Sequence, residues 1–194
     1  LQMRWDSMSA EEKEDRFVNF SKNLVEQIDT LSAIASEFSS FAKLKDTNFT
    51  EVELMSLINS SVGVYNGTND IKVSCDCDID YRIIGDKDQI LRVFNNLIKN
   101  AIQAIPKGRE GHVNVSLLEQ DNYILVSVTD NGNGISKENQ DKIFVPNFTT
   151  KNSGMGLGLA MVQKIIENMN GEITFQTTPD IGTVFIIKFP LKKD

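Results

Sequence analysis

The sequence has few of the features that mark disulfide-stapled, membrane-spanning or nucleic-acid-binding proteins. Its 194 residues include two cysteines and one histidine. No apolar run approaches the ~20 residues that a membrane-spanning helix needs, and residues 1–6 do not have the layout of a signal peptide. Because 20 Lys and Arg stand against 27 Asp and Glu, for a formal net charge of -7, no overall positive field attracts nucleic acid or anionic lipid. Any anion must therefore be bound by a local group of donors.

The two cysteines, Cys75 and Cys77, alternate along one segment. Same-face neighbours on a strand are poorly placed for a disulfide with each other. Two cysteines without further cysteine or histidine nearby do not complete a tetrahedral metal site. We therefore expect both to be reduced residues of a strand.

The composition is globular, 40% hydrophobic and 24% charged, and the length allows one medium domain with an appendage. Residues 9–44 are predicted to form that appendage as one long helix, with Ser9 and Glu12 at the spacing of a capping box. Its apolar residues recur every three or four positions: Phe17, Phe20, Leu24, Ile28, Leu31, Ile34, Phe38 and Phe41. Such a stripe must pack on a partner helix, in this chain or in another copy. Residues 1–8 are interpreted as the end of a preceding helix.

A second domain is predicted from residue 47. Thr50 and Glu53 repeat the capping spacing before a short apolar helix. The elements expected after it are two short strands within residues 71–84, a helix over 86–105, a hairpin of 112–119 with 123–129, a helix over 157–169, and an antiparallel pair of 172–177 with 183–191. A long loop with many glycines separates the hairpin from the last helix.

The sequence DNGNG at residues 130–134 follows the end of a predicted strand. It presents the carboxylate of Asp130 beside backbone with little side-chain bulk. An ionised carboxylate only accepts hydrogen bonds, which suits an exocyclic amine such as that of adenine. A simple turn is the alternative interpretation.

The sequence GMGLGL at residues 154–159 opens the predicted helix over 157–169. Glycines there let backbone N–H groups approach a phosphate, whose charge the helix dipole favours. The spacing matches neither the P-loop nor the dinucleotide-binding pattern. A flexible loop without a ligand is the alternative.

Asn96 and Asn100 lie four residues apart in the predicted helix over 86–105, on one face beside its apolar stripe. An amide oxygen, with phosphate oxygens and waters, would complete an octahedral Mg²⁺ site without adding negative charge. Hydrogen bonds to nearby loop backbone are the structural alternative.

The order of five motifs is specific: residues 96–101, 130–134, 144–148, 154–159 and 182–183. It closely resembles the ATP-binding domain of bacterial sensor histidine kinases, whose N box, F box and three G boxes occur in this order. The resemblance covers about residues 50–190. It implies an α/β (α+β) two-layer sandwich, the Bergerat-type ATP-binding fold with a mixed sheet, preceded by a long α-helix from a helical hairpin. Residues 1–46 would be the partial dimerisation hairpin and residues 47–194 the ATP-binding catalytic domain.

The resemblance also implies a role for each motif residue. Asn100 would bind Mg²⁺, and Asn96 would support the phosphate region as the second catalytic residue. Asp130 would bind the adenine amine, with room given by Gly132 and Gly134. The remaining residues expected at the nucleotide are Gly154, Gly156, Leu157 and Gly158 at the phosphates, Phe144, Phe148 and Lys151 in a mobile lid, and Thr183 near the adenine.

Two features depart from the resemblance. Residues 37–42 resemble the second hairpin helix of nitrogen-regulation-type sensors, but the family's phosphorylated histidine lies in the first helix, in a His-Glu-x-x-x-Pro setting that does not occur here. The single histidine, His112, is interpreted as a structural or surface residue at a strand start. Gln103 and Ala104 replace the basic and aromatic pair that often follows the N box. The phosphate charge would then be met by one of three lysines, Lys99, Lys107 or Lys151.

The function implied is a kinase that uses ATP and Mg²⁺ to phosphorylate a histidine on an upstream helix, for relay to the receiver domain of a response regulator. The full-length protein would be a homodimer through the hairpin, and these residues the cytosolic portion of a membrane-anchored sensor. One alternative is ATP hydrolysis, as in gyrase, MutL and related chaperones. Those enzymes place a glutamate where this sequence has Asn96, whose amide cannot act as a base. A noncatalytic dimerisation scaffold, the other alternative, leaves the five motifs unexplained.

Overall fold

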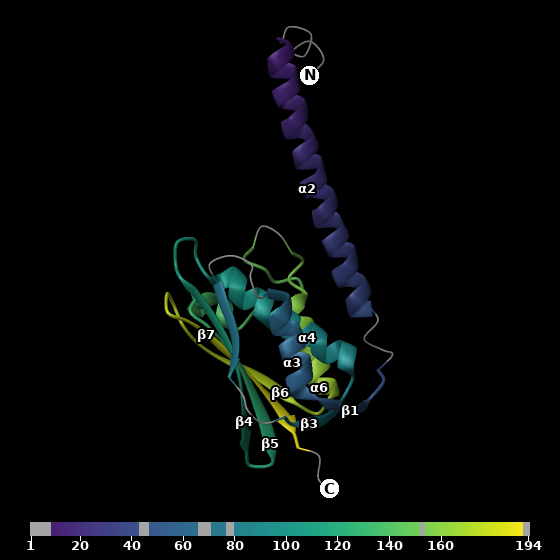
Figure 1. Cartoon of the computed structure of the whole chain (residues 1–194), viewed down its shortest axis with the longest axis vertical. Coiled ribbons are helices and arrows are strands. Elements are labelled where there is room, and N and C mark those ends of the chain that lie inside the picture. Colours follow the sequence, from purple (N-terminus) through teal and green to yellow (C-terminus); the bar gives the residue numbers. More distant parts are fainter. Residues whose placement is uncertain (1–8, 43–46, 66–70, 77–79, 152–153, 192–194) are drawn as a thin grey trace.

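A computed structural model describes residues 9–42, 47–65, 71–76, 80–151 and 154–191. It consists of one long helix and a compact body of helices packed on a sheet (Figure 1). The elements are α2 (Ala10–Ala42), β1 (Thr50–Glu53), α3 (Leu54–Tyr65), β2 (Ile71–Asp76), β3 (Arg82–Gly85), α4 (Lys87–Ala104), β4 (Gly111–Gln120), β5 (Tyr123–Asp130), α5 (Lys137–Gln140), α6 (Gly158–Asn168), β6 (Glu172–Thr178) and β7 (Gly182–Pro190).

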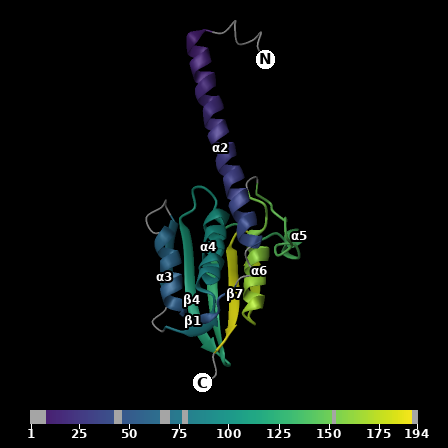
Figure 2. The same cartoon turned by 90° about the vertical axis from the view of Figure 1, so that its right-hand side faces the viewer.

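Helix α2 begins as its sequence predicts. The Glu12 N–H donates to Ser9 Oγ at 3.2 Å, and the Ser9 N–H donates to Glu12 Oε2 at 2.8 Å, which confirms the capping box. The helix projects from the body as a single rod (Figures 1 and 2). The apolar side chains Phe17, Phe20, Leu24, Ile28 and Leu31 are 44–63% exposed, so the stripe lies open to solvent along this part of the helix. Residues 1–8, interpreted as the end of a preceding helix, lie outside the described residues.

The body has two layers, as the sequence predicts. Its sheet has the strand order β2-β4-β5-β7-β6, in which β2 runs parallel to β4 and the other pairs are antiparallel. Helices α3, α4 and α6 lie side by side on one face of it (Figures 1 and 2). The core lies between the layers, where Phe94 and Leu97 of α4 and Val126 of β5 are all 0% exposed.

The expected helix start at Thr50 is wrong. Residues 50–53 form β1, which pairs antiparallel with β3 in a separate two-stranded sheet. Only Val52 of these four residues is buried, and Arg82 of β3 bridges Glu51 and Glu53 at 3.2 and 2.7 Å. The pairing with β3 and this cross-strand charge pairing favour a strand over a helical first turn.

Helix α3 is instead capped by residues that are distant from it in the sequence. The Leu54 N–H donates to the Tyr81 carbonyl at 2.9 Å, and the Met55 N–H donates to Asp80 Oδ1 at 3.1 Å. These groups satisfy the first donors of the helix, which have no partner within it. The two strands expected within residues 71–84 are both present, but β2 and β3 belong to different sheets. Cys75 is a free thiol in β2, whereas Cys77 lies outside the described residues.

The Asp86 side chain caps the start of α4 and also binds the segment that follows α2. Asp86 Oδ1 accepts hydrogen bonds from the N–H groups of Asp88 and Gln89 at 3.0 and 3.1 Å, while its Oδ2 accepts from the Asn48 N–H at 2.8 Å. Asp86 is 9% exposed. One carboxylate therefore caps α4 and fixes the chain where it enters the body.

Replacing Asp86 by Ala should lower the free energy of unfolding by about 1–2 kcal/mol, because it removes a buried N-cap. Urea unfolding of the chain measures this. Asp88→Ala is the matched control, since it removes an exposed carboxylate from the same turn and should cost only about 0.3–1 kcal/mol through the helix dipole. Equal losses in the two variants would show that Asp86 is no more than a surface charge.

Candidate functional site

The residues singled out in the sequence come from four places that the fold brings together. Asp130 ends β5 and is paired in register with Thr183 at the start of β7. Asn96 and Asn100 lie on α4, whose neighbour α6 begins at Gly158. The loop of residues 144–151 precedes α6 and lies beside it with α5 (Figure 2). The candidate site is the region enclosed by these segments.

Asp130 is a buried carboxylate with one oxygen in use. It is 6% exposed, and its Oδ1 accepts hydrogen bonds from the N–H groups of Gly132 at 2.8 Å and Thr183 at 3.3 Å. No group in the described part of the chain donates a hydrogen bond to its Oδ2. Burial raises the pKa of Asp130 above its ordinary value, even though the two backbone hydrogen bonds act to lower the pKa. The end of β5 thus holds a hydrogen-bond acceptor, the Asp130 carboxylate, whose burial lowers the stability of the fold.

The loop after Asp130 is braced by the chain that follows α4. The Arg109 guanidinium donates to the carbonyls of Asn131 and Gly132 at 2.7 and 2.9 Å, and the Asn133 N–H donates to the Ala104 carbonyl at 2.9 Å. The Asn131 side chain accepts from the His112 N–H at 2.8 Å and donates to the carbonyl of Glu110 at 2.9 Å. These contacts fix the DNGNG loop.

Sequence reasoning missed the bracing roles of Arg109 and Asn131. The position of Asn131, directly after the strand-end carboxylate, is a signal that could have drawn attention to it. Arg109 gives no such signal, because its partners lie 22 and 23 residues away along the chain.

Asn96 faces the start of α6. Its amide Nδ2 donates to the Arg92 carbonyl at 2.8 Å, one turn earlier in α4. A side chain at Gly158 would place its Cβ 2.7 Å from Asn96 Oδ1, so any larger residue would push the Asn96 amide from its present position. The residue before α6, Leu157, is buried and provides no side-chain cap. The first N–H groups of α6 therefore remain available to an anion.

The loop of residues 144–151 is anchored at both ends. The Phe144 ring contacts Phe175 and Phe185 edge to face, with centroids 6.1 and 6.5 Å apart. Phe148 is half-buried, and Gly156 has a φ of 66°, with its Cα so close to the Phe148 backbone that a Cβ would collide with it. Gly154 is exposed on the other side of residues 152–153, which lie outside the described residues. Phe144 and Phe148 thus fix this loop to the body at two points.

Lys151 reaches from this loop to α4. Its ammonium donates to Asn100 Oδ1 at 2.9 Å and to Gln103 Oε1. Loss of hydration lowers the pKa of Lys151 from its ordinary value, and the nearby charge of Lys99 lowers it further. Of the three lysines considered for phosphate charge, Lys151 and Lys99 therefore lie near Asn100, whereas Lys107 is in the exposed turn after α4. This local positive charge contrasts with the acidic chain.

The donor set at Asn100 fits a cation that takes most of its ligands from elsewhere. Asn100 supplies one neutral oxygen, and no group of three His, Cys, Asp or Glu side chains that could hold a metal occurs among the residues described. Mg²⁺ commonly keeps several waters and binds phosphate oxygens with few protein ligands. The residues present therefore fit Mg²⁺ brought with a phosphate compound.

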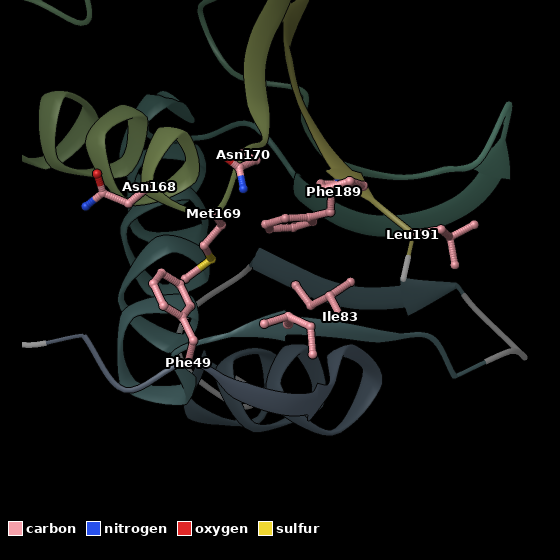
Figure 3. A pocket seen from close by; sticks show the side chains of 9 residues that line it. Phe49, Ile83, Asn168, Met169, Asn170, Phe189 and Leu191 are labelled. Carbon is pink, nitrogen blue, oxygen red and sulfur yellow. The ribbon is translucent and has the colours of Figure 1, made fainter. Parts of the chain in front are cut away.

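The His112 side chain and an apolar hollow lie outside this site, although the His112 N–H donates to Asn131. His112 is exposed at the start of β4, with Nε2 3.7 Å from Glu110 Oε1, which agrees with its interpretation as a surface residue. A hollow of about 290 Å³ lies between β3, the end of α6 and the end of β7 (Figure 3). It is lined by Phe49, Ile83, Ile84, Asn168, Met169, Asn170, Phe189, Pro190 and Leu191. It contains no charged side chain and none of the expected site residues, so it does not suit an anion.

Comparison with known proteins gives consistent matches. The family model described as "Histidine kinase-, DNA gyrase B-, and HSP90-like ATPase" matches residues 85–193. The putative sensor histidine kinase NtrY-like of Rickettsia typhi is 35% identical over 188 residues, which are 95% of this chain and 31% of that protein. The chain therefore spans about a third of the length of the curated relatives it matches. None of the helices in the described ranges is long and apolar enough to cross a membrane.

Solved structures agree with the sequence matches. The catalytic domain of histidine kinase ThkA is 34% identical with a TM-score of 0.65, over 74% of this chain and 96% of that one. Histidine kinase ThkA in complex with response regulator protein TrrA is 28% identical with a TM-score of 0.72, over 98% of this chain and 55% of that one. The predicted Bergerat-type fold and the resemblance to sensor histidine kinases are confirmed.

Asp130→Asn should make the free chain more stable relative to wild type as the pH rises. The pKa of Asp130 is higher in the folded chain than its ordinary value of 3.8, so the unfolded chain loses this proton first, and ionisation favours unfolding. The amide carries no such penalty. Urea unfolding should give a larger stability advantage of the variant at neutral pH than below pH 3.8. Asp141→Asn, at an exposed aspartate, is the control, and a variant advantage that does not grow with pH would contradict the burial cost.

Proposed function

The chain belongs to the family of histidine kinase-, DNA gyrase B- and HSP90-like ATPases, and we propose that it binds ATP with Mg²⁺ and transfers the γ-phosphoryl group to a histidine on an upstream helix. The observation that carries this proposal is the buried Asp130 carboxylate, which keeps one oxygen unused. A fold retains a destabilising buried acceptor where a ligand needs it. The exocyclic amine of adenine is a neutral donor that matches it.

The adenine end of the site is preorganised by hydrogen bonds within the chain. The N–H groups of Gly132 and Thr183 hold Asp130 Oδ1, which orients Oδ2 for the amine. The Thr183 hydroxyl lies 3.1 Å from the Thr177 hydroxyl, so its position is also fixed. Because these groups are already in place, little ordering is needed when the base binds. Gly134 belongs to the same braced loop.

The phosphate end would use the start of α6 and the nearby lysines. The first N–H groups of α6 have no side-chain cap and would donate to an anion bound at its N-terminus. Gly154 and Gly156 precede this terminus and leave its backbone accessible. Lys99 and Lys151 supply positive charge to the same region. When bound, Mg²⁺ would neutralise charge that develops on the transferred group, and Asn100 is the residue that would hold it.

Transfer to a histidine is favoured over transfer to water. Asn96, which faces the first residue of α6, has an amide that cannot take a proton from water at neutral pH. A neutral imidazole can attack phosphorus without that help. The exposed apolar stripe of α2 supports a partner helix that would carry the acceptor.

The remaining parts of the proposal concern the whole protein. We propose a homodimer through the helical hairpin, relay to the receiver domain of a response regulator, and a place in the cytosolic portion of a membrane-anchored sensor. The structure of ThkA with response regulator protein TrrA supports the second of these. The name of the Rickettsia typhi relative, a putative sensor histidine kinase, supports the sensor part of the third.

Asp130→Asn should weaken binding of ATP by roughly 5- to 150-fold, because the amide would turn a donor toward the adenine amine at a cost of about 1–3 kcal/mol. Isothermal titration calorimetry with a nonhydrolysable ATP analogue measures this, and circular dichroism confirms the fold. Asp141→Asn makes the same chemical change at an exposed position and should bind as wild type does. Unchanged affinity in Asp130→Asn would remove Asp130 from the site.

The chain should bind ATP with Mg²⁺ and yet fail to label itself with γ-phosphate. Its only histidine, His112, lies on a strand rather than on an exposed helix. A longer chain that includes the preceding helix should recover label that is acid-labile and alkali-stable, as phosphohistidine is. Label on the 194-residue chain that maps to His112 would contradict the proposal. Rapid release of phosphate without label would favour the hydrolytic alternative.

A further inference from the structure

The contact of Lys151 with α4 has a consequence for how the site accepts a metal. Asn100 and Gln103 lie three residues apart on α4 and share a face of it. The Lys151 ammonium donates to the side-chain oxygens of both. Within the loop, the Lys151 N–H donates to Thr149 Oγ1 at 3.1 Å. The loop of residues 144–151 is thus fastened to α4 by one cation on two amide oxygens.

The oxygen that Lys151 occupies is the oxygen that the proposed metal needs. The ammonium lies 2.9 Å from Asn100 Oδ1, and Mg²⁺ binds oxygen at about 2.1 Å. Both on one oxygen would lie within about 5 Å of each other, with Lys99 adding a third like charge nearby. Ammonium and metal repel each other at that separation, so metal binding at Asn100 Oδ1 would weaken the Lys151 contact.

The resemblance assigns the metal to Asn100 and gives Gln103 no part in holding it. Its side chain is exposed, and its oxygen accepts from Lys151 one turn beyond Asn100. It therefore stabilises only the fastened arrangement of the loop. Gln103 also stands where the resemblance leads one to expect a basic residue, which would repel Lys151 instead of accepting from it.

We propose that Lys151 is a built-in cation that occupies the metal-binding oxygen of Asn100 in the nucleotide-free chain and is displaced by the divalent cation of the metal–nucleotide complex. The inference rests on the proposed function, because it takes Asn100 as the metal ligand. Metal binding then unfastens the loop of residues 144–151 from α4. A nucleotide without metal leaves the contact in place. Part of the affinity for the metal complex is lost in displacing Lys151.

Gln103→Leu separates this proposal from a general role of the loop. The variant keeps Asn100 and Lys151 but removes one of the two acceptors that hold the ammonium. Hydrogen exchange of the loop amides without nucleotide should become at least 3-fold faster. Calorimetry should show about 3-fold tighter binding of a nonhydrolysable ATP analogue with Mg²⁺, and unchanged binding with EDTA. Lys151→Met should accelerate the same loop amides further, because it removes both hydrogen bonds.

The control is Gln176→Leu, the same substitution at an exposed position of β6, which should leave loop exchange and both affinities as in wild type. Wild-type exchange rates in Gln103→Leu and Lys151→Met would overturn the proposal. An equal change of affinity with Mg²⁺ and with EDTA would also overturn it, because the metal would not be what displaces Lys151. If the wild-type chain binds the analogue in neither condition, the proposed function fails and this inference fails with it. If it binds and only the metal dependence is absent, the inference alone fails.

Discussion

The packing of α4 against the sheet is the interaction on which the rest of the body depends. Phe94, Leu97 and Ile98 are fully buried between the layers, and burial of side chains of this size stabilises a fold by about 1.5–3 kcal/mol each. The helical period then places Asn96 and Asn100 on the side toward α6 and the loop before it. The apolar face of α4 therefore sets the direction in which its polar face presents amide oxygens. Its start is fixed in turn by Asp86, which also holds Asn48.

The site combines a negative and a positive region within a short distance along the fold. Asp130 is buried with its pKa raised, a state that costs stability in the free chain. The start of α6 and the lysines near Asn100 are positive, although the whole chain carries a formal charge of -7. An adenine nucleotide has the matching arrangement, with a hydrogen-bond donor on the base and negative charge on the phosphates. The positions of these few charged groups, and not the net charge of the chain, match the site to such a ligand.

The loop of residues 144–151 contacts the body at both of its ends. Phe144 fastens one end on the rings of β6 and β7, while Lys151 fastens the other on α4. The aromatic contact buries apolar surface and does not depend on ligands. The Lys151 contact depends on Asn100 Oδ1, an oxygen that another cation could bind. Under the proposed displacement of Lys151, the two attachments would respond differently to the same ligand: the end at Lys151 would be released and the end at Phe144 would stay in place.

The sequence by itself determined the capped start of α2 and the extents of α4 and α6, because each depends on local periodicity or on neighbours within a few residues. The order of its motifs indicated the mixed-sheet sandwich only through the family resemblance. It predicted a helix start at Thr50, where tertiary structure makes a strand paired with residues 82–85. Only the fold decided that Asp80 caps α3, that Arg109 braces Asn131, and that Lys151 reaches Gln103 across 48 residues. Hydrogen bonds between residues so far apart leave no periodic trace, since their partners become neighbours only after the core has packed.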